Sequence, residues 1–251
     1  MTVPGLDRAG PIGLAIVVLA WVALTLPAFW RSADAERIAT QIVGGRAFQL
    51  EPASRALAGI GDGGPLGLCQ PAAVRAKAIL RLYLYEDAAS AQRNDEAAQL
   101  LTTLRSDLRA ALRCIPTDGY LWLLLFSMDS RGSDVAPAHL DDLRMSYAVA
   151  PHEGWIALKR NPVALGSFTA LDPGLARLAV NEYAELVQNG LYDEAASIYA
   201  AVGAEARIAV LVRLIEVAQV HRERLSRAMD AVLPGVPIPG VDRSDDQPWK
   251  R

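Results

Sequence analysis

The sequence predicts an all-α protein in which an N-terminal transmembrane helix is followed by an array of helical hairpins. An uncharged apolar run, PIGLAIVVLAWVALTLPAFW, extends from Pro11 to Trp30 and has about the length of one membrane-spanning helix. Apolar residues recur at helical spacing through most of the remaining chain. Glycine and proline gather in a few short stretches, which is typical of loops between helices.

The apolar run predicts a membrane anchor that is retained in the mature protein. At its end, Phe29, Trp30 and Arg31 place two aromatic rings beside a cation, a combination that prefers the headgroup region of a bilayer. We therefore expect a short cytoplasmic tail over residues 1–10 and a transmembrane anchor over residues 11–30 that contacts the lipid bilayer directly.

Two alternatives to a retained anchor stay open at this point. Ala33 and Ala35 form an A-x-A pattern that a signal peptidase accepts, so the run also fits a cleaved signal peptide. A buried core helix is the other alternative, although soluble core helices of this length usually have a polar face.

The orientation of the anchor does not follow from the positive-inside rule, because Arg8 lies on one side and Arg31 and Arg37 lie on the other. The short N-terminal tail, the pair of cysteines and the lack of a second apolar run favour one topology. We expect a single-pass protein of the bacterial inner membrane with its main domain in the periplasm.

Cys69 and Cys114 are the two cysteines of the chain, and an even pair in an exported domain suggests a disulfide. If residues 71–89 and 95–115 form antiparallel helices, both cysteines lie at the same end of the hairpin. Such a bridge stabilises a fold by about 3 to 4 kcal/mol. The alternative is two buried thiols in a cytosolic domain. No C-x-x-C spacing supports a redox or zinc role.

Residues 31–70 are expected to form a juxtamembrane helix followed by a linker rich in glycine and proline. The segment from Glu51 to Pro71 contains most of the glycine and proline residues of this region and is predicted to be a loop. Gly59, Gly61 and Gly64 satisfy the G-x-G-x-x-G pattern of dinucleotide-binding turns. No buried strand precedes them and no βαβ alternation follows, so the context argues against a nucleotide site.

A helical domain over residues 71–233 and a disordered tail over residues 234–251 complete the predicted organisation. The tail is rich in proline and charge. The final helix of the domain is expected to cover the hydrophobic end of the array through its apolar residues. These are Ile208, Leu211, Val212, Ile215, Ala218 and Leu225. The helices after the linker are expected at about residues 71–89, 95–115, 120–128, 137–149 and 204–232.

An internal similarity appears within this domain. The segments CIPTDGYLWLLL around Pro116 and VAPHEGWIALKR around Pro151 lie about 35 residues apart. Each joins a helix end to a proline, an acid, a glycine and a helix that contains tryptophan. In this respect the chain resembles the tetratricopeptide repeat family, in which helix pairs stack into a superhelix. Pro116 and Trp122 have the family's spacing between a closing proline and the next repeat's first aromatic residue.

A second segment, NGLYDEAASIYAAV, matches the same family through Gly190, Tyr192, Ala195 and Tyr199. The resemblance covers about residues 95–205 and is degenerate, because Trp155 comes two residues early and no proline closes the Gly190 repeat. It implies a tetratricopeptide-like array with a concave binding surface. An irregular helical bundle, which uses the same apolar stripes to fill a core, stays open as the alternative.

Tyr120, Trp155, Lys159 and Arg160 are the candidates for a partner-binding face of this array. Aromatic and arginine side chains are frequent at the centres of protein interfaces. The same aromatic residues also fit a helical core, and this alternative stays open. We expect the partner to be another envelope or membrane protein.

Charge and motifs exclude several other functions. The chain has 25 Lys and Arg against 28 Asp and Glu, so no broad basic surface for nucleic acid is expected. His139, His152 and His221 do not form H-E-x-x-H, and neither G-K-[ST] nor G-x-S-x-G occurs. Glu153 is a single acid after a proline, which is too common to specify a glycosidase. We therefore expect no catalytic residue, no metal ligand and no cofactor.

These observations predict a membrane-anchored scaffold that mediates protein–protein interaction in bacterial envelope assembly, with surface-polysaccharide synthesis or export as one candidate process. A structural accessory subunit, which uses the transmembrane helix as its main contact, is the alternative. An envelope hydrolase is the third hypothesis and has the least support. The sequence does not indicate an oligomeric state.

Overall fold

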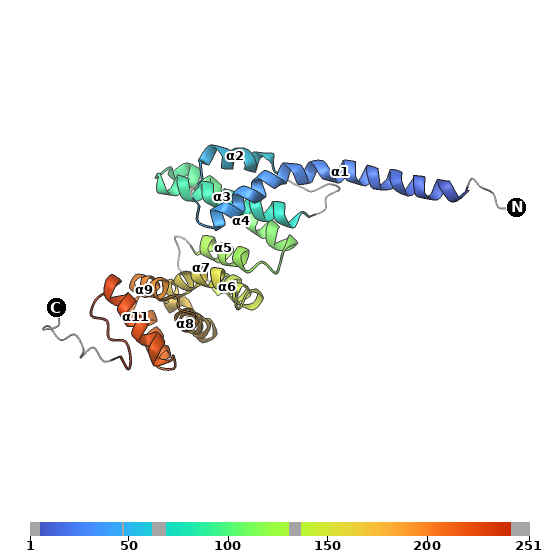
Figure 1. The fold of residues 1–251 in the computed structure, drawn as a ribbon. Coiled ribbons are helices and arrows are strands. Elements are labelled where there is room, and N and C mark those ends of the chain that lie inside the picture. The colour runs from blue at the N-terminus through green and yellow to red at the C-terminus, as the bar shows by residue number, and fades with distance from the viewer. Residues whose placement is uncertain (1–5, 47, 62–68, 131–136, 242–251) are drawn as a thin grey trace, which may run out of the picture. The chain divides into compact units, whose positions relative to one another are not determined.

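The computed structural model describes residues 6–46, 48–61, 69–130 and 137–241. Within these ranges the regular secondary structure is entirely helical, which confirms the all-α prediction. The chain divides into two compact units, unit 1 over residues 1–116 and unit 2 over residues 117–251, and Figure 1 shows their helices. The boundary between the units lies inside the single domain expected over residues 71–233.

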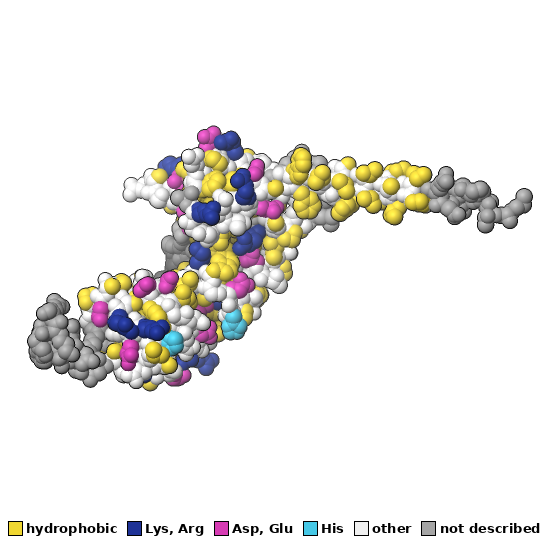
Figure 2. All heavy atoms as spheres, viewed as in Figure 1, with side chains coloured by type: hydrophobic (Ala, Val, Ile, Leu, Met, Phe, Trp, Pro, Cys, Tyr) yellow, Lys and Arg dark blue, Asp and Glu magenta, His cyan; other side chains and the backbone are white. Residues whose placement is uncertain are grey.

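Helix α1 (Leu6–Val43) of unit 1 runs through the predicted anchor and continues to the helices that pack against its C-terminal half. The described side chains of its N-terminal half are mostly exposed, and Figure 2 shows hydrophobic side chains along this part of the helix. The C-terminal half contacts α2 (Leu50–Gly59) and α3 (Pro71–Ser90). It buries Ala35 and Ile38, which are 0% and 4% exposed.

The apolar run of α1 is only partly described. The side chains of Pro27, Ala28 and Arg31 lie outside the described residues. Among the residues that are described, no helix has an apolar stretch long enough to cross a membrane.

Helix α2 lies in the segment from Glu51 to Pro71, for which the sequence predicts a loop. That prediction is wrong for this helix because Pro52 falls in its first turn, where a missing N–H costs no intrahelical hydrogen bond. Residues 53–58, ASRALA, then favour a helix that ends at Gly59. Residues 62–68, in the glycine-rich part of the predicted linker, are not described.

Helices α3 and α4 (Asn94–Cys114) form the hairpin at the core of unit 1. Asp107 of α4 accepts a hydrogen bond from Arg81 Nε of α3 at 2.5 Å and lies 3.5 Å from Lys77 Nζ. These charges are partly buried and lie beside an apolar interior. The hairpin buries small and branched side chains close together. They include Ala76, Ile79, Leu80, Leu104, Leu108 and Ala111.

The described helices of unit 2 are short, and the longest has 16 residues. They are α5 (Gly119–Asp129), α6 (Pro137–Val149), α7 (Gly154–Gly166), η2 (Phe168–Ala170), α8 (Pro173–Gln188), α9 (Tyr192–Ala201), α10 (Ala204–Leu214) and α11 (Gln219–Val232). Helix α7 packs on α8, α5 on α6, and α9 on α11. Asp118 and Asp172 cap α5 and α8, since each carboxylate accepts two backbone N–H groups of the first turn.

The sequence predicts one helix over about residues 204–232, and the structure has two. After Leu214, the N–H groups of Ile215, Glu216 and Val217 bond to carbonyl groups three residues earlier, at 3.0–3.3 Å. This tighter winding ends α10 without a glycine or proline, so no breaker residue marks the turn in the sequence. The turn buries Val217, which is 2% exposed, and α11 then packs against α9 and α8.

The disorder predicted for residues 234–251 does not extend to residues 234–241. Ile238 is 3% exposed, and Arg222 of α11 donates a hydrogen bond to the backbone carbonyl of Pro239. One buried apolar side chain and this hydrogen bond hold the segment against α11. Residues 242–251 lie outside the described part of the chain.

Candidate functional site

The four residues predicted to form a partner-binding face are only partly at the surface. Trp155 is 40% exposed and Lys159 is also exposed. Tyr120 is 7% exposed and packs against Trp155 with ring centroids 5.1 Å apart, whereas Arg160 is fully buried. The predicted face is therefore corrected, because covered side chains cannot contact a partner. Of the four residues, Trp155 and Lys159 are exposed and can contact a partner.

Arg160 on α7 is the centre of a buried polar network that joins α6, α7 and α8. Its guanidinium donates to the backbone carbonyls of Ser146 and Ala150, at 2.7 and 3.1 Å, at the C-terminal end of α6. It also forms an ion pair with Glu182 of α8, with an N···O distance of 2.5 Å. The Tyr147 hydroxyl donates to Glu182 at 3.1 Å, and the Tyr147 ring lies under the guanidinium. This set of partners compensates the cost of burying the charges.

Burial also changes the acid–base properties of the network. It raises the pKa of Glu182 above its ordinary value, and the Arg160 guanidinium opposes this shift. Burial, reinforced by the negative charge of Glu182, raises the pKa of Tyr147 well above its ordinary value. Because Arg160 and Glu182 are 0% and 5% exposed, the network offers no atom to a ligand. The network joins α6, α7 and α8 of unit 2 through these hydrogen bonds and the ion pair.

An open groove of about 600 Å³ lies between α8 and α10. Arg213 of α10 donates a hydrogen bond to Asn181 Oδ1 of α8 at 2.7 Å and pairs with Glu216 at 2.5 Å. Arg177 also lines the groove, is exposed, and has no ion-pair partner among the described residues. The groove is therefore apolar with charged groups beside it. Its apolar lining consists of Phe168, Ala176, Val180, Ala209 and Val212.

The exposed face of α10 continues this apolar surface. Ile208 and Val212 of α10 and Ile215, which directly follows it, are 64%, 62% and 59% exposed, whereas Val210 and Leu214 of α10 are fully buried. The expectation that these three residues cover the end of the array is therefore wrong, whereas Leu225 of the same predicted set is fully buried. Two apolar stripes on one short helix are the sequence signal for this face, because one core contact can bury only one of them.

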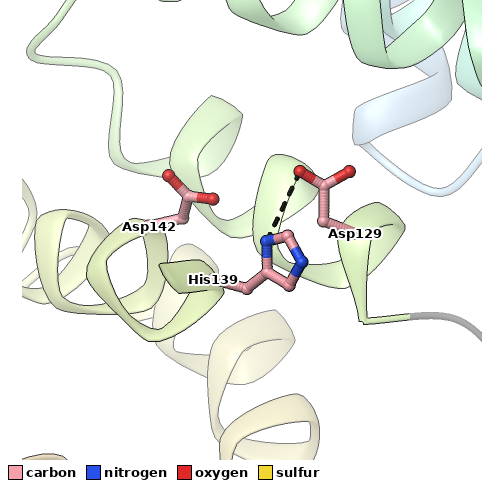
Figure 3. A group of neighbouring side chains, drawn as sticks. All are labelled: Asp129, His139 and Asp142. Atoms are coloured by element: carbon pink, nitrogen blue, oxygen red, sulfur yellow. Dashed lines mark ion pairs between the residues drawn. The ribbon is translucent and has the colours of Figure 1, made fainter. Parts of the chain in front are cut away.

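A second group of polar side chains lies where α5 meets α6. Figure 3 shows Asp129 at the end of α5 facing His139 and Asp142 of α6. His139 Nδ1 lies 3.7 Å from Asp129 Oδ2, and one donor atom from each of the three residues lies within 4.8 Å of the others. The Asp129 side chain is 5% exposed and that of His139 is 29% exposed. Sequence analysis did not predict this group, although the H-x-x-D spacing of His139 and Asp142 places both on one helix face.

The remaining predicted site residues lie in unit 1. Cys69 and Cys114 form a disulfide with their Cα atoms 6.0 Å apart, and it joins the start of α3 to the end of α4. Phe29 and Trp30 are 57% and 76% exposed on α1. The side chain of Arg31, the third residue of the predicted membrane interface, lies outside the described residues.

No family model, curated protein sequence or solved structure matches this chain. Assignment of a function therefore rests on the groove, the exposed face of α10, the polar group of Figure 3 and the apolar run of α1.

Proposed function

We propose that the chain is a membrane-anchored helical scaffold of the bacterial envelope that binds an amphipathic helix of a partner protein. The observation that carries this proposal is the exposed stripe of Ile208, Val212 and Ile215 beside the groove. Its i, i+4, i+7 spacing is that of anchor positions in helix-in-groove recognition. Adjacent exposed apolar side chains of this kind are typical of interaction surfaces.

The membrane part of the proposal is supported by residues 11–30. This run contains no charged residue, and its side chains include Leu14 and Leu19, which are 67% and 68% exposed. Apolar surface exposed to water is unfavourable by about 25 cal/mol per Å², and a bilayer removes that cost. Phe29 and Trp30 then lie where the anchor meets the headgroup region, on the periplasmic side in the proposed orientation.

Charge defines the chemistry of the proposed partner. Arg177 places an exposed cation beside the apolar lining of the groove, and it has no ion-pair partner among the described residues. An occupant with an acidic side chain next to its apolar face complements this cation, and such complementarity sets specificity and orientation. The proposed occupant is therefore an amphipathic helix that carries an acidic residue at the edge of its apolar face.

The packing of α8 and α9 supports the proposal that unit 2 is a tetratricopeptide-like array. Gly190 joins the two helices with a φ of 85°, a left-handed conformation that favours glycine. The Leu191 N–H bonds to the Leu186 carbonyl at 3.0 Å across this turn. Ala195 is fully buried, and its carbonyl accepts a hydrogen bond from the Tyr183 hydroxyl at 2.9 Å. A small residue at this position permits the close approach of the two helices.

Site-specific photo-crosslinking in intact cells tests the proposed binding face. A photoreactive residue at Val212 of α10 is expected to crosslink to one partner segment. The same residue at Val220 of α11 is the matched control, because Val220 is also an exposed valine, at 50%, and does not line the groove. Equal crosslinking from both positions, or none from Val212 in a folded protein, would contradict the proposal.

A charge exchange then tests the chemistry of the partner. The crosslinked segment, synthesised as a peptide, is expected to bind the purified full chain more weakly after Arg177→Glu, by about tenfold for a loss of 1.4 kcal/mol. Replacing the acidic residue of the peptide by lysine is expected to restore binding to Arg177→Glu. Lys159→Glu is the control, since Lys159 is exposed but does not line the groove. Failure of the exchange would contradict the acidic-helix proposal.

The alternative function is a structural accessory subunit whose main contact is the transmembrane helix. It is favoured by the exposed apolar side chains of α1, which can pack against other transmembrane helices as well as against lipid. The two functions differ in which part of the chain selects the partner, so exchange of residues 11–30 for an unrelated membrane helix separates them.

A further inference from the structure

We infer that Asp129, His139 and Asp142 form a binding site for one divalent transition-metal ion, and that zinc is the best match. This inference is independent of the proposed partner helix, because none of the three residues lines the groove of unit 2. The three side chains come from the end of α5 and from one face of α6, and Figure 3 shows them gathered at this junction.

The spacing of the donor atoms is close to that of a metal site. Donors about 2.1 Å from a tetrahedral ion lie about 3.4 Å from one another. His139 Nδ1 and Asp129 Oδ2 are 3.7 Å apart, and the three donor atoms lie within 4.8 Å of each other. A direct hydrogen bond between His139 and Asp129 would be shorter than this. Binding of an ion requires the partly exposed His139 and Asp142 side chains to rotate closer to Asp129.

The second observation is that the Asp129 carboxylate is buried. Its side chain is 5% exposed, and the attraction between a carboxylate and a cation is stronger where water is excluded. Imidazole nitrogen is a common ligand of metal ions, and His139 lies beside this carboxylate. An ion bound between them links the C-terminal end of α5 to the first turns of α6.

The donor set selects among metals. One imidazole nitrogen and two carboxylates suit zinc and related divalent ions, which accept nitrogen and oxygen ligands in tetrahedral sites. Calcium requires six to eight oxygen ligands, and magnesium prefers oxygen ligands and retained water. Three protein ligands also leave one position of a tetrahedral zinc ion open to water or to a further ligand.

Metal titration of the full chain tests the site. The protein, purified in detergent without an affinity tag and stripped of metal, is expected to bind one Zn²⁺ per chain in calorimetry. Co²⁺ in the same site is expected to give the visible absorption of a tetrahedral ion. His139→Asn and Asp142→Asn are expected to weaken Zn²⁺ binding by more than about tenfold, since even loss of a group that supports a ligand has that effect.

Two matched variants serve as controls. His152→Ala removes an exposed histidine outside the group, and Asp141→Asn changes the exposed acid next to Asp142. Both are expected to keep one Zn²⁺ per chain and the Co²⁺ spectrum, and circular dichroism verifies that all variants are folded. The inference is overturned if the wild-type chain binds no Zn²⁺ at 100-fold molar excess, or if folded His139→Asn binds it as tightly as the wild type.

Discussion

Unit 1 and unit 2 both consist of packed helices, but different interactions join those helices. In unit 1 a disulfide between Cys69 and Cys114 closes the α3–α4 hairpin, and its ion pair at Asp107 is only partly buried. In unit 2 the fully buried Arg160 pairs with Glu182 and joins α6, α7 and α8. Both cysteines of the chain lie in unit 1. A covalent bond thus stabilises one unit and a buried polar network stabilises the other.

Loss of the disulfide and loss of the buried ion pair are expected to have different effects on stability. A disulfide acts mainly by restricting the unfolded chain, so its loss leaves the native contacts in place. A buried ion pair acts in the folded state, and removal of one member leaves the other charge buried without compensation. The comparison therefore predicts the larger effects for unit 2.

The largest effect is expected for Glu182→Leu, which leaves the Arg160 guanidinium buried without its carboxylate. The free energy of opening of α7 and α8 is expected to fall by about 3 to 5 kcal/mol. Amide hydrogen exchange followed by mass spectrometry measures this for peptides from each unit separately. Glu185→Leu, an exposed position on the same helix, is the control and is expected to change it by less than about 0.5 kcal/mol.

A double variant tests whether the buried, unpaired charge causes this loss of stability. Arg160→Met combined with Glu182→Leu removes both charges and is expected to recover most of the stability lost in Glu182→Leu, because apolar pairs often replace buried ion pairs without net cost. If the double variant is as unstable as the single one, packing and not charge explains the loss.

The next effect is expected in unit 1 when Cys69 and Cys114 are both replaced by serine. The cysteines are 45 residues apart in the sequence, and closure of such a loop contributes about 3 to 4 kcal/mol. Hydrogen exchange in α3 and α4 peptides is expected to rise accordingly, while exchange in α7 and α8 stays unchanged. Faster exchange in both units would contradict the separate stabilisation of the two units, since it would show that the disulfide stabilises the whole chain.

The smallest effect is expected for Gly119→Ala, at the start of α5. An added Cβ at this position lies 2.4 Å from Ala150 Cβ and 3.3 Å from the Ser146 carbonyl oxygen. The helices have to move apart slightly, which costs about 1 to 3 kcal/mol. Gly154→Ala is the matched control, because Gly154 also begins a helix and a Cβ there has no neighbour within 4 Å. Equal thermal stabilities of the two variants would rule out close α5–α6 packing at Gly119.

Much of the helical content could be predicted from local sequence. The helix predicted over residues 137–149 has those bounds in the structure, and the predicted range 71–89 differs from α3 by one residue. In both cases a proline stands at the first position, where its fixed φ favours a helix start. Strong local signals of this kind do not depend on the rest of the fold.

The candidate sites depend on contacts between helices, so the sequence predicted them poorly. From the sequence alone, Arg160 is expected at the surface, because its partners Ser146 and Glu182 lie on two other helices and no local pattern indicates the pairing. From the sequence, Val212 is expected to be buried in one long helix, because residues 215–218 contain no glycine or proline that would indicate a turn. Asp129 and His139 become neighbours only through the pairing of α5 with α6.

We propose that unit 2, and not the apolar run of α1, selects the partner. Residues 11–30 are replaced by an unrelated single transmembrane helix in a chain that carries the photoreactive residue at Val212. Membrane fractionation and circular dichroism verify that this chain is anchored and folded. We predict that it gives the same crosslinked partner segment as the chain with its own anchor. Loss of that crosslink from the folded, membrane-bound chain would contradict the claim and favour the accessory-subunit function.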